Sequence, residues 1–581
     1  MVQTPTIPEF WTAIERGQPL SGEPWLLELE KAARSEAAFD IPSARKALDV
    51  SNPTDTKWQG VHELLSIRVE LREGQQQALR GLKHRLADLI NGGLDDASLA
   101  RAWHTTGVLH LRLNEFQRAE AALLEALRLI DDSPSRLWIL DSLGQCNQGE
   151  GAWSEARRLL QAVARAKENS GEVLGTAISI GNLALLELGL GHNSSAEAAL
   201  RDVLVRLEPQ LPSLTRVRLH TLLLQSVLQT PRQTDQALRL EAVLAETGQA
   251  SHHLKAFAAL AMARARPDDA DIWLRRAEKD FSAPADLALV RYWRLRLLPK
   301  SVDDAAQVAE TRALIKRAGS GTEAELLTHL LFAERGQGTR VMHQHLDEAF
   351  EFAKLANNPL WVERVDRLYE RLDPRGFSHR VLERFAGRSV AELEATTLED
   401  ATSIFADLVG FTARSQELAP EEVMDTVRSL FEIAVPLFVR FRVRPLQYQG
   451  DGLLAVCQGE GHAARGLGFA RAFVAKTLRV TQVRQALGDK WGLTVRAGVA
   501  SGPTVLGVLG SHYKMEFQAI GRTVNLAARL QGQSEPGEVC AAVATAQAAA
   551  IDTSSMREES AALKGFGAPE AFFRLAISPK E

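Results

Sequence analysis

The chain has 581 residues, of which 45% are hydrophobic and 24% charged, and its net charge is −5 at pH 7. This length exceeds what one ordinary hydrophobic core supports, so we expect two or more domains of ordinary globular composition. The weakly acidic balance gives no electrostatic case for a nucleic-acid partner.

The cellular location is expected from what the sequence lacks. The first residues contain no basic region followed by an apolar run, and no stretch of about 18 apolar residues is present, so we predict neither a signal peptide nor a membrane-spanning helix. The three cysteines, Cys146, Cys457 and Cys540, lie far apart without metal-ligand spacing, as expected for free thiols in a reducing compartment. We therefore expect a cytoplasmic protein that does not associate with membranes.

Residues 1–373 have apolar side chains at steps of three and four residues, which predicts helix nearly throughout. A unit of helix, short turn and second helix recurs, with a small alanine near the start of each second helix. The anchors Ala119, Ala156 and Ala196 are 37 and 40 residues apart. The pattern is similar to tetratricopeptide repeats with lengthened copies, with weaker copies around Ala237 and at 346–354.

That similarity implies an all-α solenoid whose concave surface binds an unidentified protein or peptide. A non-repetitive helical domain is the alternative. Pro374 and Gly376 end the helical pattern, so we expect a linker over 374–398 and a separate domain over 399–581.

Two acidic residues mark this last part. Asp407 and Asp451 each lie at the edge of an apolar, strand-like run and beside a glycine-containing turn. After Asp407 the chain enters a helical pattern, and the Gly450–Asp451 turn has the form of a hairpin tip. A lone aspartate in such a place is commonly a turn or capping residue. Two carboxylates brought together repel, however, and Mg²⁺ or Mn²⁺ removes that penalty, which favours a two-metal phosphoryl-transfer site.

Four blocks in this part carry a resemblance to a known family, with a weaker fifth around Lys564. They are Phe405-Ala-Asp-Leu-Val-Gly-Phe-Thr, Gln449-Gly-Asp-Gly, Val495-Arg-Ala-Gly-Val-Ala-Ser-Gly-Pro and Ile520-Gly-Arg-Thr-Val-Asn-Leu-Ala-Ala-Arg-Leu530. In this order, they resemble the catalytic domain of class III nucleotidyl cyclases, over roughly a third of the chain.

The resemblance implies an α+β, ferredoxin-like domain that works as a head-to-tail homodimer with its catalytic sites in the interface. It implies conversion of a nucleoside triphosphate, with ATP first, to a 3′,5′-cyclic nucleotide and pyrophosphate, with two Mg²⁺ or Mn²⁺ ions per site. The residues that match the family's functional positions are, for metal binding, Asp407, Leu408 and Asp451; for catalysis, Asn525, Arg529 and Lys564; and for substrate binding, Phe405, Gly410, Phe411, Thr412, Gln447 and Gln518.

Asn525 and Arg529 also make chemical sense without the resemblance. They are four residues apart in a helical pattern and so share one helix face, from which a guanidinium can bind phosphate oxygens. A merely polar helix face is the alternative.

Two positions depart from the family pattern. Where adenylyl cyclases commonly have a lysine and an aspartate that bind adenine, this chain has Gln447 and Gln518. An amide offers both a donor and an acceptor, so these residues do not fix the base. A guanylyl or pyrimidine cyclase, or a weakly active cyclase-like dimerisation scaffold, stays open.

Residues 377–385 form a short amphipathic run that resembles the coupling segment found before cyclase domains. A site shared between protomers would respond to a small rotation of one against the other. We therefore expect the helical region to regulate the enzyme through this segment.

Overall fold

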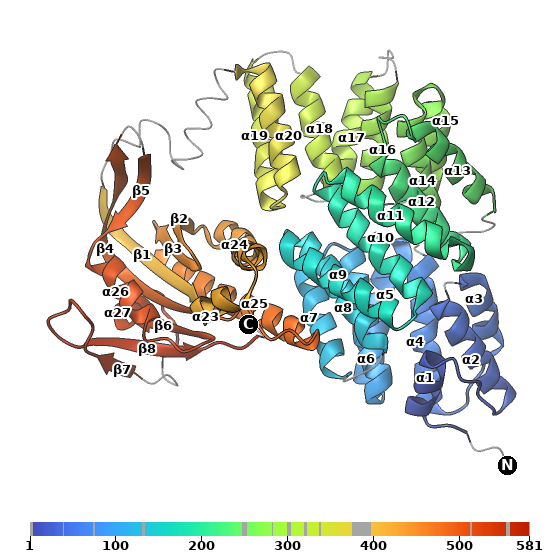
Figure 1. The fold of residues 1–581 in the computed structure, drawn as a ribbon, viewed down its shortest axis with the longest axis horizontal. Helices are drawn as coiled ribbons and strands as arrows, with labels where there is room; N and C mark the ends of the chain where they lie inside the picture. Colours follow the sequence, from blue (N-terminus) through green and yellow to red (C-terminus); the bar gives the residue numbers. More distant parts are fainter. Residues whose placement is uncertain are drawn as a thin grey trace. The chain divides into compact units, whose positions relative to one another are not determined.

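The structure is a computed structural model that describes residues 4–38, 40–73, 76–130, 134–246, 252–281, 283–298, 304–318, 322–335, 339–374, 397–511, 514–553 and 558–579. The chain forms two compact units, one from most of residues 1–362 and one from residues 363–581 with the short segments 151–154 and 355–357 (Figure 1). Each unit is described by itself.

The first unit is helical, as the apolar periodicity predicts. Two short 3₁₀ helices, Glu208–Gln210 and Pro267–Asp269, interrupt the α-helices. The α-helices of the described residues before the second unit's sheet are α1 (Ile7–Glu15), α2 (Pro24–Ala37), α3 (Ile41–Val50), α4 (Thr56–Glu73), α5 (Gln76–Asn91), α6 (Asp96–Arg112), α7 (Phe116–Arg128), α8 (Pro134–Gly149), α9 (Trp153–Asn169), α10 (Val173–Gly189), α11 (Asn193–Leu207), α12 (Ser213–Ser226), α13 (Gln233–Glu246), α14 (His252–Ala265), α15 (Ala270–Asp280), α16 (Pro284–Leu297), α17 (Asp304–Ala318), α18 (Glu323–Arg335), α19 (Thr339–Leu355) and α20 (Pro359–Leu372).

The repeat anchors lie where helices meet. Ala119, Ala156 and Ala196 are fully buried near the starts of α7, α9 and α11. Helices α6 and α7 also approach closely at Gly107, where an added Cβ would lie 2.5 Å from Leu123. These contacts explain the recurring small residues. They do not by themselves establish tetratricopeptide repeats, and that assignment stays a prediction.

The second unit is an α+β domain with a mixed sheet. Within the described residues the strands run in the order β2-β3-β1-β4-β6-β8-β7, with β5 paired to β4; β4 and β6 are parallel and the other pairs antiparallel. The elements are β1 (Thr397–Leu408), α23 (Phe411–Glu417), α24 (Pro420–Phe441), β2 (Arg444–Gln449), β3 (Gly452–Gln458), α25 (His462–Ala486), β4 (Val495–Ser511), β5 (Lys514–Ile520), α26 (Arg522–Gln531), β6 (Glu538–Ala542), α27 (Val543–Ala548), β7 (Glu558–Ala561) and β8 (Glu570–Ala576).

The two-residue period of β1 separates a core face from a site face. Ile404, Ala406 and Leu408 are buried in the main core of this unit together with residues of α24 and α25. The alternate residue Phe405 packs instead with residues of α26, and Asp407 belongs to the same side by strand alternation. The sheet therefore presents Asp407 on the face that carries α26.

Gly498 allows α26 to lie close against β4. A Cβ at this position would overlap the backbone nitrogen of Gln531 and the carbonyl oxygen of Ala527. Glycine is thus required here by space, and it explains the Val-Arg-Ala-Gly block of the sequence.

Other expectations have mixed outcomes. The run at 377–385 and most of the expected linker lie outside the described residues, so the boundaries at 373 and 399 stay predictions. All three cysteines are free and buried. Among the helices that the structure describes, none has both the length and the apolar character of a membrane span.

Candidate functional site

The two aspartates lie at neighbouring strand ends. Asp407 is the penultimate residue of β1 and pairs across the ladder with Gly452, the first residue of β3. Asp451 immediately precedes Gly452 in the two-residue turn between β2 and β3, where Gly450 adopts the left-handed φ of 61°. The hairpin tip that the sequence predicts is therefore present, and it brings the second acid to the end of β1.

The acid pair is electrostatically unfavourable without a cation. Burial and the charge of Asp407 raise the pKa of Asp451 to about 6, and a hydrogen bond with the Asp407 side chain acts in the same direction. Two carboxylates that compete for one proton in this way form a donor set for a hard divalent cation.

Protein groups compensate the pair only in part. An Nη2 of Arg496 lies 3.4 Å and the Nε2 of Gln531 lies 3.3 Å from Oδ2 of Asp407, both longer than a strong charge-assisted hydrogen bond. The buried Nε of Arg496 has no hydrogen-bond partner. The residues present therefore fit a bound Mg²⁺ or Mn²⁺, which Asp407 and Asp451 would hold.

Helix α26 carries the two proposed transition-state residues. Asn525 and Arg529 are both exposed, and they share the helix face opposite the buried Leu526, Ala527 and Leu530. Gln531, which contacts Asp407, is two residues after Arg529, about 200° further round the helix. This angle places Arg529 on the side of α26 away from the acid pair of its own chain.

The loop of Lys564 lies against the same helix. Leu563 is buried in one cluster with Leu526 and Leu530, and Arg522 forms an ion pair with Glu570 at the end of this loop. Lys564 itself is exposed. The fold thus brings the loop of Lys564 against α26, and the role of Lys564 as a phosphate ligand stays a prediction.

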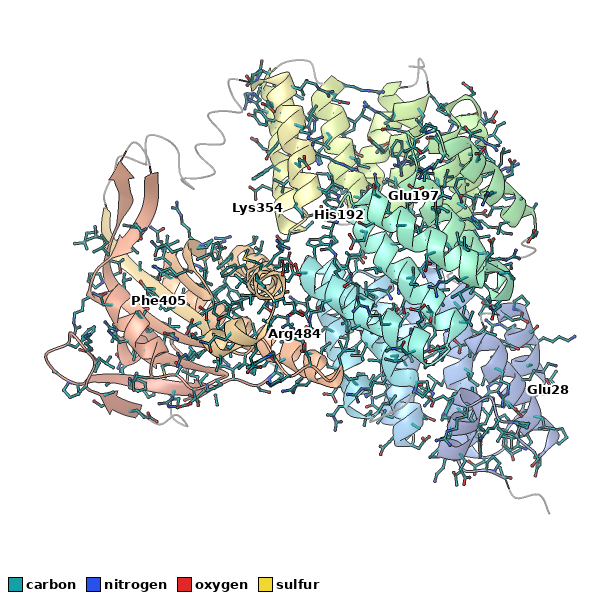
Figure 2. All side chains as sticks on the ribbon, in the orientation of Figure 1. Glu28, His192, Glu197, Lys354, Phe405 and Arg484 are labelled. Carbon is teal, nitrogen blue, oxygen red and sulfur yellow. The ribbon has the colours of Figure 1, made fainter. Side chains whose placement is uncertain are left out.

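The turn after Asp407 has the predicted order of strand, turn and helix. Leu408 ends β1 with its side chain buried, so only its backbone atoms are available to a metal. Gly410 has a φ of 74°, and α23 begins with Phe411 and Thr412. Phe405 lies two residues before Asp407 on β1, within the sheet (Figure 2).

The two glutamines lie on different strands. Gln447 is half-buried on β2, and its Oε1 accepts a 2.8 Å hydrogen bond from Nε2 of Gln449. Gln518 is half-buried on β5, paired with Gly507, and β5 contacts β2.

Sequence reasoning missed three residues of this site: Gln449, Arg496 and Gln531. Each lies inside or next to a motif block and on the α26 face of the sheet or at the end of α26. Strand alternation could have placed Gln449 on the same face as Gln447. Arg496 lies beside Asp407 through the register of β1 and β4, which no local pattern shows. The contact of Gln531 depends on the close packing at Gly498, which no local pattern shows.

Comparison with known proteins concerns the part of the chain that holds these residues. The family model "Adenylate and Guanylate cyclase catalytic domain" matches residues 393–574. The C-terminal part of the chain carries a class III cyclase catalytic domain.

The relatives include both adenylate and guanylate cyclases. An adenylate cyclase of Mycobacterium tuberculosis is 28% identical over 147 residues, which cover 25% of this chain and 32% of that protein. The receptor-type guanylate cyclase gcy-20 of Caenorhabditis elegans is 24% identical over 266 residues, or 43% of this chain and 23% of the relative. The chain thus spans about a third or less of the curated relatives' length. The solved adenylyl cyclase CyaB from P. aeruginosa is 25% identical, with a TM-score of 0.30, and the match covers 32% of this chain and 97% of CyaB.

Proposed function

We propose that this protein is a nucleotidyl cyclase that forms a 3′,5′-cyclic nucleotide and pyrophosphate from a nucleoside triphosphate, with ATP the first candidate. The observation that carries the proposal is the undercompensated pair of Asp407 and Asp451, held together by the β1–β3 ladder. A dimerisation scaffold has no need of two mutually repelling carboxylates at the end of a sheet.

The chain's residues would act by positioning and by charge. Asp407 and Asp451 would hold two Mg²⁺ or Mn²⁺ ions, which activate the attacking ribose oxygen and neutralise the phosphates when bound. Backbone N–H groups of the turn from Gly410 to Thr412 would bind the triphosphate. Asn525 would orient the ribose, while Arg529 and Lys564 would stabilise the charge that develops on the phosphates.

The proposed enzyme is a homodimer. Arg529 faces away from the acid pair of its own protomer, since Gln531 takes the side of α26 that contacts Asp407. A complete site then needs Asp407 and Asp451 from one chain and Asn525 and Arg529 from its partner.

The orientation of Gln447 supports ATP as the first candidate. Because Gln449 donates to the Gln447 carbonyl, Gln447 presents its NH₂ group, a donor like the lysine of adenylyl cyclases. Adenine and cytosine have an acceptor nitrogen beside an exocyclic amine, whereas guanine presents an N–H in that place. This favours ATP, keeps CTP as a second candidate and disfavours GTP.

The test is an incubation of purified full-length protein with Mn²⁺ and each of ATP, GTP, CTP and UTP, with products separated by mass spectrometry. We expect cyclic AMP as the main product and no product from the Asp451→Ala variant, which should remain a dimer. A lack of cyclic product from both the full chain and a fragment of residues 377–581 would instead support the scaffold.

The helical unit is proposed to regulate this activity by binding a protein or peptide. The same two preparations test this, because regulation requires the fragment and the full chain to differ in rate under equal metal and substrate. Equal rates of the fragment and the full chain would mean that the helical unit has no regulatory effect in the absence of its partner. Regulation would then require that a candidate partner, added to the full chain, changes its rate.

A further inference from the structure

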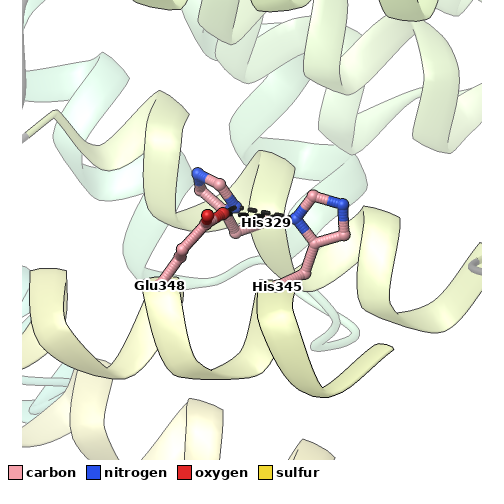
Figure 3. A group of neighbouring side chains, drawn as sticks. All are labelled: His329, His345 and Glu348. Atoms are coloured by element: carbon pink, nitrogen blue, oxygen red, sulfur yellow. Dashed lines mark hydrogen bonds and ion pairs between the residues drawn. The ribbon is translucent and has the colours of Figure 1, made fainter. Parts of the chain in front are cut away.

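A cluster of metal-binding side chains lies in the helical unit, far along the chain from the cyclase motifs. His329 comes from α18, and His345 and Glu348 come from α19, one helical turn apart. The three side chains point toward one another (Figure 3). Among the residues that the structure describes, this is the one group of three or more His, Cys, Asp or Glu side chains whose ligand atoms all lie within 4.8 Å of one another.

The three ligand atoms form a nearly regular triangle. The Nδ1 atoms of His329 and His345 are 3.0 Å apart, and Oε2 of Glu348 lies 2.9 Å from the first and 3.5 Å from the second. Ligands of a tetrahedral Zn²⁺ with bonds of about 2.0–2.1 Å are separated by about 3.3 Å. The triangle therefore already has the dimensions of three corners of such a site.

Hydrogen bonding alone satisfies this triangle poorly. Each of its three close contacts needs a shared proton, yet a neutral imidazole carries a single N–H and a carboxylate carries none. If both Nδ1 atoms donate to Glu348, two N–H groups face each other at 3.0 Å. If only one carries a proton, at least one close pair has no hydrogen between its atoms. A single cation at the centre satisfies all three atoms together.

The surroundings hold the ligands in the form that binds metal. Burial lowers the pKa of both histidines, which keeps their rings neutral at pH 7. The side chain of His345 is 10% exposed and that of Glu348 is 41% exposed, so the cluster is buried on one side and open to solvent on the other. The rings of Phe332 and Phe352 lie against His345 and His329, respectively.

We propose that His329, His345 and Glu348 bind one transition-metal ion of the Zn²⁺ class, with solvent in the fourth position, and thereby join α18 to α19. Two imidazoles and one carboxylate favour Zn²⁺, Co²⁺ or Ni²⁺ over the Mg²⁺ that carboxylate oxygens prefer. The site is thus chemically distinct from the acid pair of the cyclase domain.

The positive charge of Arg312 works against a cation at this cluster. Its charge lowers the pKa of both histidines, and its guanidinium lies 4.7 Å from the centre of the Phe332 ring. Removing this charge should therefore strengthen metal binding. If the cluster were held only by hydrogen bonds to the Glu348 carboxylate, the same substitution should change its stability no more than an ordinary surface substitution does.

The experiment uses full-length protein with Asp407→Asn and Asp451→Asn, so that the acid pair does not contribute. After chelation and dialysis, Zn²⁺ is titrated by calorimetry, and Co²⁺ by visible absorption, which reports a four-coordinate ion. We expect one ion per chain, no displacement by Mg²⁺ and a higher melting temperature of the helical signal in circular dichroism.

Matched variants locate the ion. His345→Gln and Glu348→Gln should each weaken binding by about tenfold or more, whereas His343→Gln, a histidine on the same helix outside the cluster, should leave it unchanged. Arg312→Gln should tighten binding. Glu348 is half-exposed, so its variant keeps the test decisive if the buried His345→Gln protein unfolds. The absence of saturable Zn²⁺ binding, or equal binding by the Glu348→Gln protein, would overturn the proposal.

Discussion

At the scale of single residues, the acid pair lowers the stability of the metal-free protein, and the proposed metal ions would offset this cost. The raised pKa of Asp451 means that the folded protein retains a proton that the unfolded chain has already lost. Over the window from about pH 4 to about pH 6 the folded state therefore binds more protons, and its stability falls as pH rises.

The Asp451→Asn variant tests this trade. In metal-free buffer we expect it to be more stable than the wild type at about pH 7.5 and nearly equal to it at about pH 4, because the wild-type carboxyl is then neutral as well. Urea unfolding at both pH values measures the difference. Adding Mn²⁺ should stabilise the wild type alone; an equal effect on the variant would contradict the metal assignment.

A second residue-scale prediction concerns the base. Gln447→Glu keeps the shape of the side chain but replaces its NH₂ donor with an acceptor. We expect the ratio of kcat/KM for ATP to that for GTP to fall by about tenfold or more, the value of roughly one hydrogen bond that is lost and left unpaired. Gln449→Met is the companion variant, since it removes only the hydrogen bond to the Gln447 carbonyl. It should weaken the preference for ATP over GTP without reversing it. An unchanged ratio in both would show that Gln447 does not contact the base.

At the scale of elements, the seating of α26 on β4 controls the position of Gln531 beside Asp407. Gly498→Ala should destabilise the protein by about 1–3 kcal/mol or more, because its Cβ would overlap helix backbone that cannot move aside freely. Activity should fall as well, although no residue of the site is changed. Gly567→Ala is the control, since a Cβ there meets nothing within 4 Å. Wild-type stability of the Gly498→Ala protein would mean that α26 is not held as close to β4 as the structure shows.

The sequence predicted elements better than contacts. The strand that ends near Asp407, the hairpin tip at Asp451 and the helix of Asn525 and Arg529 follow from local periodicity and glycine-containing turns, and the structure contains all three. The contacts of Gln531 with Asp407 and of His329 with His345 join separate elements, so no local pattern encodes them. The spacing of the small residues also could not assign the helical region to tetratricopeptide repeats, because many helical arrays bury small residues at similar spacing.

At the scale of the whole molecule, the proposed site requires two chains. Arg529→Ala should lower the rate by about 10²–10³-fold, as expected for loss of one transition-state donor, and Asp407→Ala should be inactive. Mixed in equal amounts, the two should recover about a quarter of the wild-type rate, because half of randomly formed dimers carry one intact site out of two. Proven heterodimers without recovered activity would count against the shared site.

The opposed faces of α26 have a consequence for how output depends on protein abundance. In the proposed dimer each chain carries the two halves of the site on different sides, so a single chain would have no turnover. Below the dimer dissociation constant, the number of complete sites grows with the square of the protein concentration, so doubling expression would raise cyclic-nucleotide synthesis about fourfold. At dilute levels a cell would then register the copy number of this protein more steeply than that of an enzyme active as a monomer.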